Sequence, residues 1–270
     1  MAWIDPLFSI KPLRKAIWRL WYPYLTRQLA KEESHRTVFL NYAYETEPPW
    51  NLPLDPADES DRGCIQLYHH TATLGGRSLS GLDVLEASCG HGGGASYLTR
   101  TFHPRSYTGL DLNPEAVRFC QRHHSLPELR FLTGDAENLP FPDNSFDAVV
   151  NVEASHCYPD FPRFLTGVSR VLRPGGYFHY ADFRFDVAIP EWEQALQAAP
   201  LRVLESRVID AEVLRGMDLN SARSEALMQR HLPRFLHGLG RDFAGIRGSR
   251  IYQALKDGTL SYRSMLLRKS

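Results

Sequence analysis

The sequence predicts an α/β fold built on a mostly parallel sheet with helices on both faces. Short apolar segments alternate with helix-forming segments from about residue 82 to residue 208, which is the pattern of strand–helix–strand units in a parallel sheet. The first apolar segment, 82–86, leads into a glycine-rich turn and then a helix expected from about Ala95. With 270 residues, the chain is long enough for one catalytic domain with additions.

The first 80 residues are expected to form a helical and irregular lid and wrap. Residues 10–31 have apolar positions three and four apart and are predicted to be helical. This segment is basic and aromatic and contains no acid, which leaves three alternatives: a lid over the active site, a helix in peripheral contact with a membrane surface, or a packed helix with a solvated charged face. Residues 45–61 are acidic and rich in proline, and we expect an irregular wrap over the sheet.

The segment 81–209 is expected to form the cofactor-binding core. After 82–86, its further strands are predicted at 107–111, 130–135, 145–152, 177–181 and 201–209. The stretch Val171–Tyr177 contains Arg-Pro-Gly-Gly, which indicates a helix end and a tight turn into the next strand. We expect Asp182 to stand at the end of that strand.

The remaining two segments are assigned to a lid and to the edge of the core. Residues 210–257 are predicted to form a helical lid insertion, whose polar helix-forming part reaches about Gly238–Gly240. Residues 258–270 alternate weakly between apolar and polar side chains, and we expect a strand that closes the sheet.

The glycine-rich turn predicts a nucleotide-type cofactor site. Its spacing, Gly90-x-Gly92-x-x-Ala95, also fits a dinucleotide fingerprint, so an NAD(P)-binding oxidoreductase remains an alternative. Glu86 lies four residues before Gly90, where it would repel a pyrophosphate and attract an ammonium group. S-adenosylmethionine carries such an ammonium group, and its carboxylate can lie at the N-terminus of the following helix.

Two later acids lie where such a cofactor needs partners. Asp111 ends the second predicted strand, 21 residues after Gly90, where its carboxylate can accept hydrogen bonds from both ribose hydroxyls. Asp135 and the backbone N–H of Ala136 follow the third strand and can contact the adenine edge.

With these positions in view, the chain resembles a known family. The stretches LEASCGHGGG, YTGLDLN, GDAENLPFPDNSFDAVV and RVLRPGGYF resemble class I S-adenosylmethionine-dependent methyltransferases over roughly residues 80–185, which implies a Rossmann-like fold with a seven-stranded sheet. Stretches around 18–23, 41–45, 67–69 and 151–158 are similar to the phthiotriol/phenolphthiotriol dimycocerosate O-methyltransferases and related enzymes that act on lipids, polyketides, peptides and glycolipid sugars.

The expected cofactor contacts follow from these residues and from the resemblance: Tyr68, Glu86, Ser88, Gly90, Gly92, Asp111, Leu112, Asp135, Ala136 and Asn151. Ser88 occupies the position at which the family usually has its first glycine, and we expect its backbone to keep a negative φ. Tyr68 is equally well explained as a core residue.

Two residues after the strand ends are candidates for catalysis. His156 follows the strand that ends near Val152, and Asp182 follows the next strand; the resemblance implies that these strands are neighbours. Histidine, with an ordinary pKa of about 6.5, can take the proton of a hydroxyl, and a carboxylate on its other nitrogen would fix the tautomer. We therefore expect in-line methyl transfer to a hydroxyl of a small-molecule secondary metabolite, such as a lipid, polyketide, peptide or sugar, with His156 as the base and Asp182 as its orienter.

Other acceptors and functions remain open. A fatty acid carboxylate would need no base, and carbon methylation is compatible with the same frame. A catalytically silent module that binds the cofactor is a third alternative. The formal net charge of zero and the lack of an Asn-Pro-Pro-Tyr run after Asn151 argue against nucleic acid as the acceptor.

The sequence also bears on metals and location. We expect no metal requirement, because the sequence has no Asp-Asp-Asn cluster of the kind that indicates a magnesium site. The pairs His69–His70 and His123–His124 would point in different directions on a helix and are not expected to bind a metal. The four cysteines are scattered without CxxC spacing, which predicts reduced thiols in a cytoplasmic protein. No apolar run reaches membrane-spanning length and no signal pattern is expected; the oligomeric state is not predicted.

Overall fold

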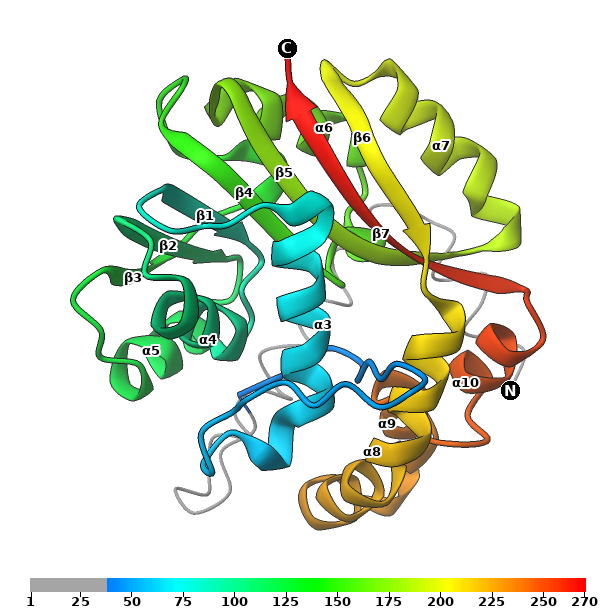
Figure 1. Cartoon of the computed structure of the whole chain (residues 1–270). Helices are drawn as coiled ribbons and strands as arrows, with labels where there is room; N and C mark the ends of the chain where they lie inside the picture. Colours follow the sequence, from blue (N-terminus) through cyan, green and yellow to red (C-terminus); the bar gives the residue numbers. More distant parts are fainter. Residues whose placement is uncertain (1–37) are drawn as a thin grey trace.

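A seven-stranded sheet forms the centre of the computed structural model, which describes residues 38–270 (Figure 1). The strand order is β3-β2-β1-β4-β5-β7-β6; β1 to β5 pair in parallel, and β7 is antiparallel to both of its neighbours. The strands are β1 (Asp83–Ala87), β2 (Ser106–Asp111), β3 (Leu129–Thr133), β4 (Phe146–Val152), β5 (Leu172–Phe185), β6 (Leu201–Val208) and β7 (Leu260–Lys269). The predicted fold class is confirmed, whereas the helix predicted at 10–31, with its three alternatives, lies outside the described residues.

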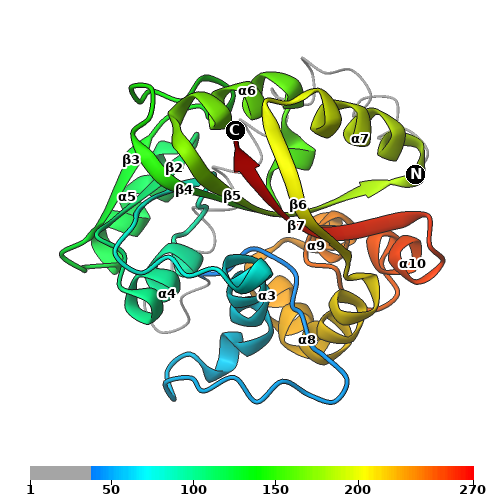
Figure 2. The ribbon, with the colours of Figure 1, turned by 45° about the horizontal axis from the view of Figure 1, so that its top comes forward.

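Helices cover both faces of this sheet, as Figure 2 shows. The helices α3, α4 and α5 contribute to one buried apolar cluster, and α6 and α7 contribute to a second. Three more helices lie beyond the end of β6 (Figure 1). The helices are α3 (Arg62–Thr73), α4 (Gly93–Phe102), α5 (Pro114–His123), α6 (Phe161–Val171), α7 (Ile189–Ala198), α8 (Asp210–His231), α9 (His237–Phe243) and α10 (Arg250–Lys256).

Helix α6 illustrates how local sequence produces these layers. Its buried residues Phe161, Phe164, Leu165 and Val168 recur at the spacing of one helical face. The Asp160 side chain accepts a hydrogen bond from the backbone N–H of Arg163 at 3.1 Å and so caps the first turn. The apolar face then packs in the cluster that contains β4 and β5 residues, which fixes the outer end of the loop between β4 and α6.

The parallel strands all end at one edge of the sheet, and the segments around that edge differ in part from the predictions. Residues 45–61 are largely irregular, as predicted, but their hydrogen bonds go to helices: the Glu45 N–H donates to Glu212 O of α8 at 3.0 Å, and Gln66 of α3 donates to Trp50 O at 2.8 Å. The segment therefore wraps over α3 and α8 rather than directly over the sheet.

Several element boundaries also differ from the predictions. β5 begins at Leu172 rather than at Tyr177, so the predicted tight turn lies within the strand, where the register with β4 shifts, and α4 begins at Gly93 rather than near Ala95. The helix predicted through 210–240 ends at His231 and resumes at His237, because Pro233 has no N–H to continue the helix and restricts the residue before it. Strand β5 continues beyond 181 to Phe185, since β7 pairs with it as far as Phe185 opposite Leu260. Asp182 therefore lies inside a strand.

Two further findings concern the thiols and the membrane. All four cysteines are free, as the sequence predicted, and Cys157 is the most accessible of them. Within residues 38–270, no helix is both long and apolar enough to cross a bilayer.

Candidate active site

The loop after β1 brings backbone close to the carboxyl edge of the sheet. Gly90 and Gly92 have positive φ angles of 56° and 78°, a conformation that favours glycine. A Cβ at Gly92 would lie 2.9 Å from the Phe131 ring, so the chain can take this path only without a side chain. The loop passes directly into α4, whose first N–H group, that of Gly93, donates to Val38 O at 3.1 Å.

Asp111 links the end of β2 to this loop. Its carboxylate accepts hydrogen bonds from the backbone N–H groups of Gly90 and Asn113, both at 2.9 Å. The residue is only 5 % exposed, and burial raises the pKa of its carboxyl to about 6 although the two backbone hydrogen bonds act in the opposite direction. The carboxylate is thus held rigidly beside the glycine loop, as a partner for ribose hydroxyls requires.

The residues predicted to flank an adenine ring lie next along the same edge. The backbone N–H of Gly134 donates to Asp111 O at 2.9 Å, which joins the ends of β3 and β2. Asp135 accepts a hydrogen bond from Glu137 N–H at 3.0 Å and caps a short 3-10 turn that begins at the buried Ala136. Leu112 is 37 % exposed, which leaves an apolar surface at this edge.

Glu86 and Tyr68 are placed in the core instead of at the open edge. Glu86 is fully buried, and its two carboxylate oxygens accept hydrogen bonds from the hydroxyls of Tyr68 and Tyr107 at 2.9 and 2.8 Å. Burial raises the pKa of Glu86 to about 7 against these two hydrogen bonds. A Cβ at Gly94 would lie 2.0 Å from the Tyr68 ring, so α3 and α4 meet closely here. Both carboxylate oxygens of Glu86 therefore already have hydrogen-bond partners. The contact of Glu86 with an ammonium group remains a prediction.

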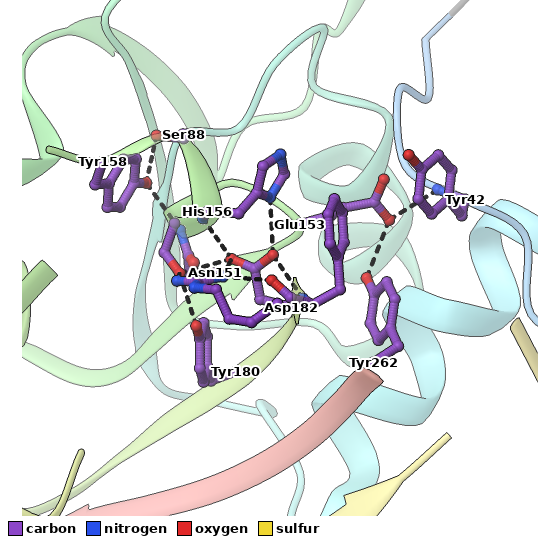
Figure 3. A network of polar contacts seen from close by, with 12 residues as sticks. Tyr42, Ser88, Asn151, Glu153, His156, Tyr158, Tyr180, Asp182 and Tyr262 are labelled. Carbon is purple, nitrogen blue, oxygen red and sulfur yellow. Dashed lines mark hydrogen bonds and ion pairs between the residues drawn. The ribbon is translucent and has the colours of Figure 1, made fainter. Parts of the chain in front are cut away.

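The prediction of a negative φ at Ser88 is wrong: the structure gives a φ of 60°. Its hydroxyl lies 2.6 Å from the Tyr158 hydroxyl, and Asn151 donates hydrogen bonds to that same hydroxyl at 3.0 Å and to Ala87 O at 2.8 Å (Figure 3). This tertiary network holds Ser88 in a left-handed conformation that the local sequence disfavours. It also connects the loop after β1 with the segment after β4.

We expect Ser88→Gly to be more stable than Ser88→Ala by about 1 kcal/mol. Both changes remove the hydroxyl that contacts Tyr158, but only alanine keeps a Cβ in the left-handed region. Urea unfolding of the two variants without added cofactor measures the difference. Equal stabilities, or a more stable alanine variant, would contradict the strain inferred at this position.

The structure brings the two predicted catalytic residues together. His156 lies in η4 (Ser155–Cys157) after β4, and its Nδ1 is 2.8 Å from Oδ1 of Asp182 on β5. The backbone N–H of His156 donates to the other carboxylate oxygen at 2.9 Å (Figure 3). The Asp182 side chain is fully buried, whereas that of His156 is 24 % exposed. Because the carboxylate requires a proton on Nδ1, Nε2 is left for chemistry at the open side.

Asp182 is surrounded by donors, which determines its charge. Ser155 Oγ donates to Oδ2 at 2.6 Å, the N–H of Phe183 donates to Oδ1 at 2.8 Å, and an Arg184 guanidinium nitrogen lies 3.3 Å from Oδ2. Burial by itself would raise the pKa of the Asp182 carboxyl, but Arg184, His156 and these hydrogen bonds lower it below its usual range. The carboxylate is therefore ionised at neutral pH.

The imidazole of His156 holds its proton tightly. Burial opposes the charged form, but the neighbouring Cys157 and Asp182 raise the pKa of His156 to about 10. The ring and Asp182 form an ion pair in the protein without ligands. A cation bound beside the ring would lower this pKa again, because like charges disfavour protonation.

A buried acid and an aromatic wall complete the site. Glu153 has a φ of 53°, and its Oε2 accepts hydrogen bonds from the N–H of Tyr42 at 2.9 Å and from the Tyr262 hydroxyl at 3.0 Å (Figure 3). Burial raises the pKa of Glu153 to about 8. The Phe183 ring stacks against His156 and Tyr42, with centroids 4.3 and 5.7 Å apart. Phe183 and Tyr42 are each only 6 % exposed, so the partly exposed His156 ring is the part of this cluster that a ligand can reach.

Several residues of this network were not identified from the sequence. Ser155 and Arg184 contact Asp182, and Tyr158 links the two loops. One signal was present: Tyr180, Asp182 and Arg184 alternate along one strand and must share a face. Among the described residues, no group of three or more His, Cys, Asp or Glu side chains is arranged to hold a metal ion.

Comparisons with known proteins identify the family to which the chain is similar. A family model described as "Methyltransferase domain" matches residues 85–180. The chain is 57 % identical over 255 residues to a phthiotriol/phenolphthiotriol dimycocerosates methyltransferase of Mycobacterium tuberculosis, covering 94 % of this chain and 93 % of that protein. It is 51 % identical over 245 residues to a fatty-acid O-methyltransferase of Mycolicibacterium smegmatis, covering 91 % and 87 %.

Solved structures support the same fold at lower sequence identity. A geranyl diphosphate methyltransferase in complex with S-adenosylmethionine superimposes with a TM-score of 0.61 at 16 % identity, covering 87 % of this chain and all of that one. These similarities decide between the alternatives for the glycine turn, because the relatives are methyltransferases and not oxidoreductases. The chain therefore belongs to the family of class I S-adenosylmethionine-dependent methyltransferases.

Proposed function

We propose that the protein transfers the methyl group of S-adenosylmethionine to a hydroxyl oxygen of a lipid, with His156 as the general base. The observation that carries this proposal is the Nδ1–Asp182 hydrogen bond, which leaves Nε2 of a partly exposed imidazole at the carboxyl edge of the sheet. The names of the relatives favour a lipid over the polyketide, peptide and sugar acceptors that the sequence left open.

The residues of the edge fit the proposed cofactor. Asp111 would accept the ribose hydroxyls, and Leu112 with Asp135 and Ala136 would flank the adenine. Asn151 Oδ1 is buried and has no hydrogen-bond partner among the described residues, so it suits the ammonium group that Glu86 was expected to bind. The N-terminus of α4 after Gly90 and Gly92 would face the carboxylate.

The chain's own residues then have a limited task. When bound, the cofactor supplies a methyl group on a sulfonium that is already activated for transfer. Holding the acceptor oxygen in line with the S–CH₃ bond supplies much of the rate, and Phe183 stacks against His156 and so fixes the ring that would contact this oxygen. Nε2 of His156 accepts the hydroxyl proton, and Asp182 stabilises the imidazolium that results. Beside the positive charge that the bound cofactor would supply, His156 would hold its proton less tightly, which favours the neutral ring that can act as the base.

A second candidate function is methylation of a fatty acid carboxylate, and the raised pKa of His156 favours it. At neutral pH, the ligand-free site holds the His156 imidazolium beside Glu153. The Glu153 carboxyl, with a pKa of about 8, is mostly protonated and therefore neutral. Such a pair binds a carboxylate well, and a carboxylate needs no base.

The pH dependence of turnover separates the two candidates. With a long-chain alcohol as acceptor, kcat is expected to rise with pH until His156 has lost its proton in the bound complex. With a fatty acid, kcat/KM is expected to fall as pH rises through the His156 pKa of the cofactor complex, because the imidazolium that binds the carboxylate is lost. Transfer of labelled methyl from pH 6 to 10 with both acceptors is the measurement. A falling profile for the alcohol would contradict the base role.

A further inference from the structure

The polar network does not stop at the catalytic pair. Tyr180, Asp182 and Arg184 lie at alternate positions of β5 and project from the same face. The Tyr180 hydroxyl lies 2.7 Å from Ser155 Oγ and accepts a hydrogen bond from Trp192 of α7 at 3.0 Å. The carboxylate that orients His156 is therefore embedded in a chain of contacts that reaches the helix layer behind the sheet.

Arg184 is held against Asp182 from several sides. One guanidinium nitrogen lies 3.3 Å from Oδ2 of Asp182, and another donates to Ser155 Oγ at 2.9 Å. The guanidinium stands 4.9 Å from the Trp192 ring centroid and 5.3 Å from that of Phe161. Its side chain is 12 % exposed. A cation held this firmly in a poorly solvated place exerts a strong field on its neighbours.

Arg184 differs in charge from the other groups around the pair. From the segment after β4, Glu153 and Cys157 face the imidazole. Three tyrosine hydroxyls lie near the pair: those of Tyr180 on β5, Tyr262 on β7 and Tyr42 before α3. Among the described residues, Arg184 is the one permanently charged cation whose side chain pairs with the Asp182 carboxylate. Arg263 on β7 lies opposite Asp182 in the strand register, but its guanidinium pairs with Glu193 at 2.7 Å. Arg184 binds the carboxylate at Oδ2, whereas His156 Nδ1 binds at Oδ1.

We propose that Arg184 is a positioning residue that keeps Asp182 ionised and limits how tightly His156 holds its proton. The guanidinium neutralises part of the charge that would otherwise stabilise the imidazolium, and it also repels that second positive charge. The catalytic consequence rests on the proposed base role of His156. The effect on the titration of His156 does not depend on that role.

The test is the titration of His156 by NMR in protein labelled with ¹³C-histidine and saturated with S-adenosylhomocysteine. Arg184→Gln removes the charge and is expected to raise the His156 pKa by about one unit. Arg184→Lys keeps the charge and is expected to restore most of the wild-type value. Arg170→Gln is the control, because Arg170 binds Leu139 O and Phe141 O and pairs with Asp143 away from Asp182.

The outcomes separate this proposal from a merely structural role and from failure of the proposed function. A structural role predicts a lower melting temperature with an unchanged His156 pKa in Arg184→Gln, and that result would overturn the proposal. If Arg184→Gln does not fold, Arg184→Met removes the same charge and keeps an apolar side chain against Trp192 and Phe161; a rise of the His156 pKa is again expected, and no rise overturns the proposal. If Arg184→Gln raises the His156 pKa but the pH range over which kcat rises with an alcohol acceptor does not move with it, Arg184 controls the His156 pKa as proposed. His156 is then not the general base.

Discussion

His156→Ala is expected to lower kcat by about 10²- to 10⁴-fold with a hydroxyl acceptor. The change removes the Nε2 that would accept the hydroxyl proton, and it leaves Asp182 with its other donors, Ser155, Phe183 and Arg184. Affinity for S-adenosylhomocysteine should change by less than about threefold, because none of the proposed cofactor contacts involves the imidazole. Transfer of labelled methyl and calorimetric titration measure the two quantities.

His123→Ala is the control for this experiment. His123 lies on α5, where its Nδ1 is 2.8 Å from Phe119 O, so the variant loses an imidazole without touching the site and should retain full turnover. If His156→Ala kept turnover within tenfold of the wild type with an alcohol acceptor, His156 would be a positioning group. In that event, retained activity with a fatty acid would support the carboxylate candidate.

Asp111→Ala is expected to weaken cofactor binding by about 10²- to 10⁴-fold, since it removes two hydrogen bonds to a charged group and each contributes about 1.5–3 kcal/mol. The change removes the proposed ribose acceptor, and it also leaves the N–H groups of Gly90 and Asn113 without their partner. Isothermal titration with S-adenosylhomocysteine measures the effect. Glu115→Gln is the control, because Glu115 forms an exposed ion pair with Arg118 at the start of α5.

The pKa of Asp111 adds a pH test to the same titration. Its carboxyl titrates at about 6 in the ligand-free protein, so wild-type affinity should fall as pH decreases through 6, when the acceptor becomes protonated. Asp111→Asn cannot titrate, and its weaker affinity should be constant over that range. A parallel pH dependence in both proteins would show that another group is responsible, and unchanged affinity in both variants would remove Asp111 from the cofactor site.

Much of the fold was predictable because it follows from local patterns. Apolar segments at 82–86, 107–111 and 145–152 became β1, β2 and β4 with boundaries within two residues, since strands buried on both faces are recognisable by composition alone. The end of the helix predicted near Val171 was also confirmed. The break before Pro233 was misjudged, although the chemistry of proline could have located it.

Side-chain pairing at the site was predictable only where strand order was known. The parallel arrangement of β4 and β5 brings His156 near Asp182, and the family resemblance implied that arrangement. The hydrogen-bond partners of Glu86 were not predictable. Tyr68 on α3 and Tyr107 on β2, 18 and 21 positions away in the sequence, supply the two hydroxyls that bind its carboxylate. Their convergence depends on how α3 packs on the sheet.

The sequence by itself determined the strand series, the glycine turn and the acids that follow successive strands, because each depends on neighbours within a few residues. Only the tertiary structure decided which groups are charged and which way they face. Ser88 is left-handed because Tyr158 holds it, and Asp182 remains ionised because Arg184 and Ser155 reach it from β5 and the segment after β4. Proton affinity and backbone strain depend on burial and on partners distant in the chain, and those exist only once the chain has folded.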